Sequence, residues 1–224
     1  MNVGYAVLYV DGTLVISKYH TILQKKIIKN YGEFVDTSVP WKNESSQMKT
    51  VQILNQVKST YMKKWFTKCN HLTTLIDFKN LDVSGCTNFS HMFSYCESLQ
   101  NINELQWLNV SNGVNFSDMF YHCKTLKDID SLKTWNVSNG INFVRMFECT
   151  NIQNVLALEN WNVLNGKKFS SIFKDCIFLQ TISMPHSINY LTYTMFFNCT
   201  ENLKIHWKNH IYTYEDLLEY QTIS

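Results

Sequence analysis

Arginine is almost absent from this chain: Arg145 is the only one among 224 residues. Forked, two-bond recognition of phosphates or guanine bases by arginine is therefore not expected. An excess of charge is lacking as well, because the formal net charge is +2 at pH 7. Nucleic-acid-binding domains usually carry a clustered basic patch. We therefore expect no nucleic-acid partner.

Long apolar runs are missing too. No stretch approaches the ~20 apolar residues that a membrane-spanning helix requires, so no membrane segment is expected. The apolar run from Tyr5 to Val10 is broken by Asp11-Gly12, and no basic segment precedes it. This is not the pattern of a secretory signal peptide. We expect an intracellular, cytoplasmic protein whose thiols are free.

What the chain does have is a repeat through its last two thirds. Six of its seven cysteines recur at intervals of 27, 27, 26, 27 and 23 residues. This predicted cysteine ladder comprises Cys69, Cys96, Cys123, Cys149, Cys176 and Cys199. Aliphatic residues follow three and six positions after each of the first five cysteines. Later in the unit we align a row of Leu81, Trp107, Trp135 and Trp161, and a row of Phe89, Phe116, Phe143 and Phe169.

A period near 27 residues lies in the leucine-rich-repeat range. The sequence therefore predicts an α+β or mostly β fold, a leucine-rich-repeat-type solenoid of about six coils. Each Cys-x-x-Leu-x-x-Ile segment is expected to form one short parallel strand, so that every coil supplies one strand. Asn-Gly pairs at 112–113, 139–140 and 165–166 predict tight turns, since glycine and asparagine tolerate positive φ.

Three regions are expected. Residues 1–50 form an N-terminal cap, with a β-hairpin around Asp11-Gly12 and a short helix at Ile22–Tyr31 stopped by Gly32. Residues 51–205 form the repeats, beginning with a strand at Val51 and Ile53. Residues 206–224 form a C-terminal cap, where 213–216 resembles a capping box before a short helix with Leu217 and Leu218.

The recurring pattern Asp/Asn-Val-Ser-Asn-x-x-Asn-Phe-x-x-Met-Phe-x-x-Cys-x-x-Leu resembles the BspA-like leucine-rich-repeat family, also called the mycoplasma lipoprotein repeat. Residues 81–93 are the closest copy, and the resemblance covers roughly residues 50–205. It implies a curved solenoid used for adhesion or protein binding. Members are bacterial and protist surface proteins and uncharacterised proteins of giant DNA viruses. Without a signal peptide, the intracellular or viral branch is favoured, in a host cell or a virion.

The cysteine ladder could also indicate a metal site or disulfides. A zinc ion needs four ligands around one point, whereas a ladder presents one sulfur per coil along a line. Parallel Cβ vectors do not suit disulfides. The ladder is therefore predicted to be buried and structural, with no metal and no cofactor. Cys86 lies off the ladder and aligns with Gly113. The asparagine row is expected to satisfy backbone groups; its members are Asn88, Asn115 and Asn142.

His206 and His210 could face one way on a helix, but a surface pair is favoured over a metal site. We find no catalytic Ser-His-Asp order, phosphate loop or paired-carboxylate spacing. The protein is therefore expected not to be an enzyme.

The leading hypothesis is a non-enzymatic scaffold that binds a protein partner through the concave face of the solenoid. The small polar residues beside the strand aliphatics should point outward there and meet a basic or polar protein surface. They are Thr74, Asn101, Asn103, Asp128, Asp130, Asn154, Thr181 and Ser183. The alternative is a structural component of a virion or other assembly.

Overall fold

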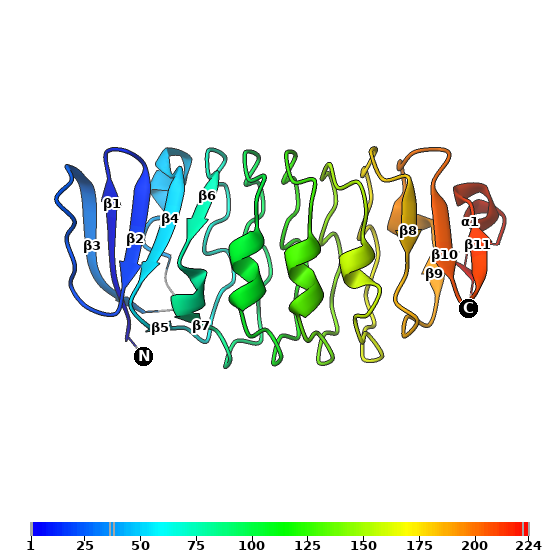
Figure 1. The fold of residues 1–224 in the computed structure, drawn as a ribbon, viewed down its shortest axis with the longest axis horizontal. Coiled ribbons are helices and arrows are strands. Elements are labelled where there is room, and N and C mark those ends of the chain that lie inside the picture. The colour runs from blue at the N-terminus through cyan, green and yellow to red at the C-terminus, as the bar shows by residue number, and fades with distance from the viewer. Residues whose placement is uncertain (1, 36, 38, 221, 224) are drawn as a thin grey trace.

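The computed structural model describes residues 2–35, 37, 39–220 and 222–223. Its repeat units lie side by side along the long axis of the molecule (Figure 1). The N-terminal strands close one end, and a hairpin and a helix close the other. The described strands fall into four separate sheets of five, three, two and two strands.

The N-terminal sheet is the largest. Its strands, in spatial order, are β3 (Ile27–Val35), β1 (Asn2–Tyr9), β2 (Thr13–Ser17), β4 (Thr50–Leu54) and β6 (Thr74–Ile76). Strand β1 pairs antiparallel with β2 across the Asp11-Gly12 turn, where the sequence predicts a hairpin. Strands β2, β4 and β6 then run parallel, so the hairpin continues into the first repeats.

Both faces of the hairpin are covered. One face, with Leu8 and Ile16, joins the main core, and the other, with Val7 and Tyr9, packs against Leu23 and neighbouring apolar residues. The Leu23 N–H donates a 2.7 Å hydrogen bond to the Tyr9 hydroxyl. Neither face of the hairpin is therefore exposed to solvent, and the side chains of β2 do not alternate between buried and exposed.

The helix predicted at Ile22–Tyr31 is wrong. Strand β3 begins at Ile27 and pairs antiparallel with β1, with register shifts along the way. Gly32 lies inside β3 at φ 64°, and its N–H binds the Asn30 side chain at 2.9 Å. The open edge of β1 offers a row of backbone partners to this segment, and that tertiary pairing overrides local helix preference.

The other sheets are small. One contains β11 (His210–Tyr212), β10 (Lys204–Trp207) and β8 (Thr181–Ser183); two pairs join β12 (Thr222–Ile223) to β9 (Leu191–Thr192) and β5 (Val57–Lys58) to β7 (Leu81–Asp82). The 3-10 helices are η1 (Lys42–Gln47), η2 (Phe78–Asn80), η3 (Asn103–Trp107), η4 (Asp130–Thr134), η5 (Leu156–Leu158) and η6 (Tyr193–Phe196). The helix α1 spans Tyr214–Tyr220.

The predicted leucine-rich-repeat-type solenoid with one short parallel strand per coil is wrong. The expected strand forms as β6, β8 and β10, but in the three central units η3, η4 and η5 follow the same segment instead. No sheet runs through the described repeats from one end to the other.

Local hydrogen bonding explains where the strand is lost. In the central units the side-chain oxygens of Asn101, Asp128 and Asn154 accept the N–H two residues later, at 2.8, 2.7 and 3.3 Å. Such bonds compete with strand pairing and start a turn. The equivalent residues in β6 and β8 are Thr74 and Thr181, whose branched side chains favour extended backbone.

In the central units most backbone hydrogen bonds between units run through the Phe-x-x-Met-Phe segment and not through the predicted strand segment. The Phe93 N–H donates to the Met119 carbonyl at 2.9 Å, and Phe120 donates to Met146 at 2.9 Å. Parallel bridges connect the asparagine row in the same region. Each asparagine oxygen also accepts the N–H two residues on, which confirms the expected structural role of Asn88, Asn115 and Asn142.

The core is built from two aromatic rows. Phe89, Phe116, Phe143 and Phe169 stack with ring centroids 5.3 to 5.4 Å apart. The second row comprises Phe66, Phe93, Phe120, Phe147, Phe173 and Phe196, at 5.3 to 5.8 Å. Each ring therefore packs mainly against its own counterpart in the neighbouring units, which explains why the sequence repeats these positions.

The Asn-Gly turns form, but positive φ is not the reason for their glycines. Gly113, Gly140 and Gly166 are not among the positive-φ residues of the described chain. A Cβ at each would instead lie 2.3 Å from the ring of a buried phenylalanine three residues later. Glycine is required there because the aromatic row comes so close to the turn.

The C-terminal end closes with the predicted capping box. The Thr213 N–H binds Asp216 Oδ2 at 2.6 Å, and the Asp216 N–H binds Thr213 Oγ1 at 3.2 Å. The bonds that the Asp216 carboxylate accepts from the Thr213 N–H and hydroxyl lower its pKa. They satisfy backbone donors at the start of α1, as a reciprocal cap should. Leu217 is buried, whereas Leu218 is exposed.

Candidate functional site

The residues predicted to contact a partner lie on the side of the units that carries β6, β8 and the helices η3 to η5 (Figure 1). We call this side the 3-10 face; it comprises residues 74–80, 101–107, 128–134, 154–158 and 181–183. All eight predicted residues are exposed except Ser183, which is half-buried. They are Thr74, Asn101, Asn103, Asp128, Asp130, Asn154, Thr181 and Ser183.

Three of the eight predicted contact residues have a structural role. The oxygens of Asn101, Asp128 and Asn154 hold the first turn of the 3-10 helices, as described above. Asn103 and Asp130 lie at the first positions of η3 and η4, and their backbone N–H groups donate the bonds to Asn101 and Asp128. Asn101, Asp128 and Asn154 therefore shape the 3-10 face, whereas Asn103 and Asp130 present their side chains on it.

Trp107 is the residue on this face that sequence reasoning missed. We had aligned it with Trp135 and Trp161, but the structure places Leu108 in their row, one residue later. The indole N–H groups of Trp135 and Trp161 donate to the carbonyls of Leu105 and Leu132, at 2.8 and 3.0 Å. Trp107 instead ends η3 with 57% of its surface exposed. The spacing of Leu105 and Leu108 matches that of Leu132 and Trp135, and this match in the sequence would have indicated the correct register.

The same face carries charge and one more apolar side chain. Asp128 and Asp130 are exposed, and within the described residues neither has an ion-pair partner. Leu156, at the start of η5, is 61% exposed. An exposed tryptophan and leucine flanking two unpaired carboxylates form a surface with both apolar and acidic features.

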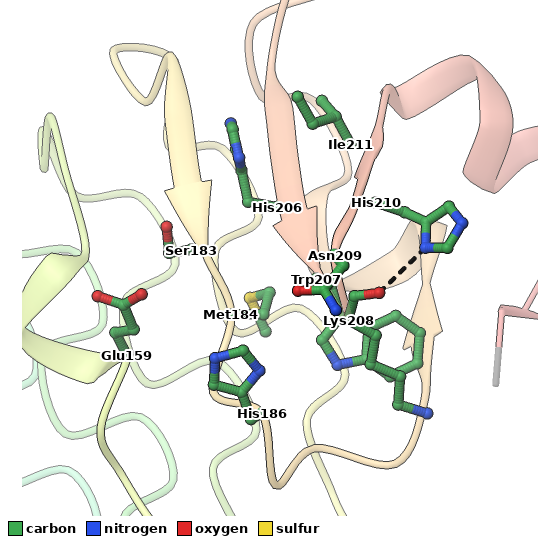
Figure 2. A pocket seen from close by; sticks show the side chains of 10 residues that line it. All are labelled: Glu159, Ser183, Met184, His186, His206, Trp207, Lys208, Asn209, His210 and Ile211. Atoms are coloured by element: carbon green, nitrogen blue, oxygen red, sulfur yellow. Dashed lines mark hydrogen bonds between the residues drawn. The ribbon is translucent and has the colours of Figure 1, made fainter.

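A pocket of about 350 Å³ lies at the C-terminal end of this face (Figure 2). Ser183 lines it together with Glu159, His186, His206 and residues 207–211. The Trp207 ring is buried, and its indole nitrogen has no hydrogen-bond partner among the described residues. Ser183 is thus a predicted contact that lies in a concavity.

The histidine pair does not sit on a helix. His206 belongs to β10 and His210 to β11, and these antiparallel strands pair His206 with Ile211. Figure 2 shows the two imidazoles pointing to different sides of the hairpin. The two side chains do not face one way on a helix, because they belong to adjacent residue pairs of the hairpin, whose side chains point to opposite faces.

The cysteine ladder is largely a row of buried thiols. Cys96, Cys123 and Cys176 donate to the carbonyl of a phenylalanine in the preceding unit at 3.1, 3.2 and 3.1 Å. Burial raises the pKa of all three thiols. Cys69 is also buried, and Cys199 is half-buried and makes the same bond to Phe173 at 3.0 Å. The thiols of Cys96, Cys123, Cys176 and Cys199 thus link successive units, and burial raises their pKa values, unlike those of activated nucleophiles.

Cys149 does not occupy the ladder position. Thr150 takes that place: it is fully buried, its hydroxyl donates to the Phe147 carbonyl at 2.8 Å, and it lies 3.4 Å from the Cys176 sulfur. Cys149 has φ 59° and matches His122 in the preceding unit. This unit is one residue shorter than the preceding one, and the missing residue falls after Thr150, not before Cys149. The 26-residue spacing between Cys123 and Cys149 therefore assigned the wrong residue to the ladder.

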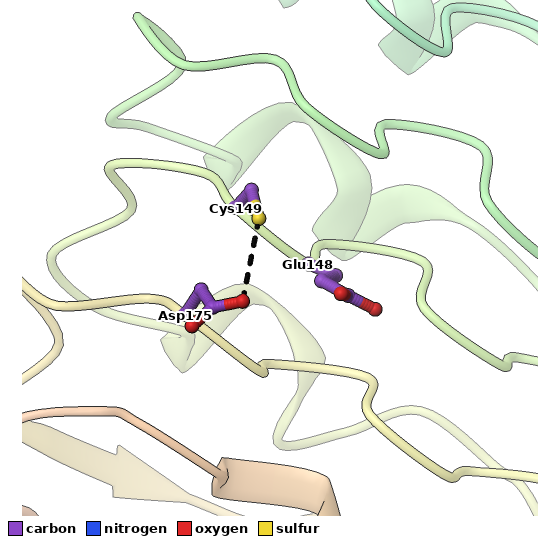
Figure 3. Close-up of side chains that lie close together, drawn as sticks. All are labelled: Glu148, Cys149 and Asp175. Carbon is purple, nitrogen blue, oxygen red and sulfur yellow. Dashed lines mark hydrogen bonds between the residues drawn. The ribbon is translucent and has the colours of Figure 1, made fainter.

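Cys149 joins an acidic group instead (Figure 3). The ligand atoms of Glu148, Cys149 and Asp175 lie within 4.8 Å of one another, the arrangement in the described residues that comes nearest to a metal site. Lys174 Nζ, however, lies 3.1 Å from Glu148 Oε1 and 3.6 Å from Asp175 Oδ2. Its ammonium already pairs with both carboxylates, and burial together with Asp175 raises the pKa of Cys149 to about 11. The group is best explained as an ion pair between two units.

Thiol labelling should separate these positions. Cys96, Cys123 and Cys176 should react with iodoacetamide only when the protein unfolds. Cys149 is half-buried, so it should react in the folded protein, slowly at neutral pH and faster as the pH rises toward about 11. Mass spectrometry of peptides after timed labelling measures each rate. Rapid native labelling of the first three would contradict their burial.

No helix among the described residues is long and apolar enough to cross a membrane. The family model described as "Mycoplasma protein of unknown function, DUF285" matches residues 37–154 and 114–209. No curated protein matches the chain. A leucine-rich cell surface protein from Faecalibacterium prausnitzii is similar at 16% identity and a TM-score of 0.43, over 86% of this chain and 58% of that one. The chain thus spans little more than half of that protein's length.

Proposed function

The chain belongs to the family described as Mycoplasma protein of unknown function, DUF285, and from that premise we propose that it is a non-enzymatic scaffold that binds a protein through its 3-10 face. The observation that carries the proposal is the exposure of Trp107. A tryptophan with 57% of its surface in water is costly to leave uncovered, and tryptophan is among the commonest anchors of protein interfaces. The resemblance of the repeat motif to BspA-like proteins, which implies protein binding, supports the same proposal.

The chemistry of the face narrows the kind of partner. Trp107 and Leu156 offer apolar contacts, and Asp128 and Asp130 lie in the unit between them, exposed and without described ion pairs. A fitting partner presents an apolar recess for the indole beside lysine or arginine side chains. Unpaired carboxylates would then steer the partner and fix its register, while the indole supplies most of the binding energy.

Affinity purification with mass spectrometry, from the cells in which the protein is made, tests this. We expect wild-type protein to retain a defined partner that Trp107→Ala loses. With the purified partner, Trp107→Ala should weaken binding by about 2 kcal/mol or more, which is roughly thirtyfold. Isothermal titration calorimetry measures the difference.

Leu164→Ala is the matched control. Leu164 is also highly exposed, at 62%, but lies in an Asn-Gly turn away from the 3-10 face. It should bind as the wild type does. A partner retained equally by Trp107→Ala would show that binding uses another surface. Purification as a large assembly of this chain, with no bound protein, would favour the alternative role as a structural component of a virion or other assembly.

A further inference from the structure

A second concave site lies near the N-terminal end. Its volume is about 470 Å³, and it is bounded by η1 and by residues 64–68 and 91–95 of two neighbouring units. Its lining includes Lys42, Lys64, Lys68 and His91, with Asn43 and Thr67 among the neutral hydrogen-bonding groups. None of its lining residues is an acid. The site is thus strongly positive in a chain whose total charge is nearly balanced.

These lysines differ from the cations farther along the same rows. Arg145 Nε lies 2.8 Å from Asp118, and Lys174 Nζ lies 3.1 Å from Glu148, so each is neutralised by the neighbouring unit. Within the part of the chain that the structure describes, Lys42, Lys64 and Lys68 have no carboxylate within ion-pair distance. Three lysines without a described ion pair therefore line this one pocket.

The backbone holds two of these lysines in place. Lys64 and Lys68 have φ of 64° and 63°, a left-handed conformation that costs energy for a residue other than glycine. Their N–H groups donate to the carbonyls of Ser90 and Ser94 in the next unit, at 3.1 and 2.7 Å. Both side chains therefore leave a fixed backbone on the same surface.

His91 completes the wall of the pocket without adding a full charge. Burial lowers its pKa, the charges of Lys64 and Arg145 lower it further, and Asp118 acts in the opposite direction. A neutral imidazole can donate or accept a hydrogen bond beside the lysines. Thr67 and Asn43 supply further donors, so an oxyanion would find both charge and directional hydrogen bonds.

We propose that this pocket binds the phosphate group of a small phosphorylated molecule, held by Lys42, Lys64 and Lys68. Lysine is a common point-charge ligand of phosphate, and hydrogen bonds from a cation to phosphate are about twice as strong as neutral ones. The volume lies within the range of about 300–1,000 Å³ typical of small-molecule sites. This site is separate from the 3-10 face and does not depend on the function proposed for it.

Calorimetric titration of the full chain with inorganic phosphate and with pyrophosphate, at constant ionic strength, tests the proposal. We expect saturable binding at one site, tighter for pyrophosphate because it carries more charge. The Lys64→Asn/Lys68→Asn double variant should weaken binding by about tenfold or more, the loss of at least one charge-assisted bond. Asparagine tolerates positive φ better than most residues, so this variant should keep its fold.

Lys127→Asn/Lys133→Asn is the control, because it removes the same charge from exposed lysines of the 3-10 face side. It should bind phosphate as the wild type does. Equal loss in both double variants, or no saturation in the wild type, would overturn the proposal. If the Lys64/Lys68 variant unfolds, Lys42→Asn provides the second test, since η1 is a separate segment, and unchanged binding there would overturn the proposal.

A phosphoserine peptide and its unphosphorylated form distinguish the source of the phosphate. Tighter binding of the phosphopeptide than of pyrophosphate would keep the phosphate chemistry and overturn the assignment to a small molecule. Weaker binding of the phosphopeptide supports a small phosphorylated ligand. Equal binding of both peptides would show that the phosphate group is not recognised, which overturns the proposal.

Discussion

Replacing Phe120 by alanine is expected to lower the free energy of unfolding by about 3–5 kcal/mol, the usual cost of removing a buried phenylalanine. Phe120 is fully buried and stacks on both sides, with ring centroids 5.8 Å from Phe93 and 5.6 Å from Phe147. Its loss therefore opens a cavity at two interfaces between units. The midpoint of urea denaturation, followed by circular dichroism, measures the effect.

Two further variants calibrate this result. Phe196, in the last unit, stacks on Phe173 at 5.8 Å and has no second ring from the row beyond it. Phe196→Ala should therefore cost less than Phe120→Ala. Asn103→Ala, at an exposed position, should change stability little. If Phe120→Ala and Asn103→Ala behave alike, the assignment of the aromatic row to the core is wrong.

Gly140→Ala is expected to destabilise the protein by about 1–3 kcal/mol, an overpacking effect far larger than one methyl group normally causes. The new Cβ would lie 2.3 Å from Phe143 Cζ and 2.9 Å from the Val137 carbonyl oxygen. The ring cannot move aside easily, because Phe143 stacks on Phe116 at 5.4 Å and on Phe169 at 5.3 Å. Thermal denaturation measures the loss.

Gly85→Ala is the control, since Gly85 lies in the corresponding turn of an earlier unit, one position before the equivalent of Gly140. A Cβ there meets only the Thr60 methyl group, at 3.3 Å. We expect a change of less than about 1 kcal/mol, since only a side-chain methyl group must yield. Equal destabilisation by the two variants would mean that flexibility of the turn, and not the Phe143 ring, explains the glycine.

Much of the local structure could be predicted because it depends on short-range chemistry. The Asp11-Gly12 hairpin, the Thr213–Asp216 cap and the asparagine row all follow from side chains that bond to nearby backbone. The eight polar residues proposed for binding were placed by alternation, and the structure does present seven of them to solvent.

Two errors of register limited the prediction of the candidate site. Trp107 was aligned with buried tryptophans because its residue type matched, although Leu108 holds the equivalent backbone position. Cys149 was placed in the ladder because its spacing matched, although Thr150 fills the space. In both cases residue identity was a poorer guide than the packing position, which a one-residue shift changes completely.

The repeat and its aromatic rows were determined by the sequence itself, because identical side chains at fixed intervals pack against one another in neighbouring units. Only the tertiary structure decided which segment carries the hydrogen bonds between units. Asn101, Asp128 and Asn154 bond to nearby backbone and leave the central units of the 3-10 face without strands, while the Phe-x-x-Met-Phe segments pair instead. That balance between local and inter-unit hydrogen bonds cannot be read from periodicity. Periodicity also cannot show that Lys42 lies beside Lys64 and Lys68, because only the packing of η1 against the first units brings these residues to one pocket.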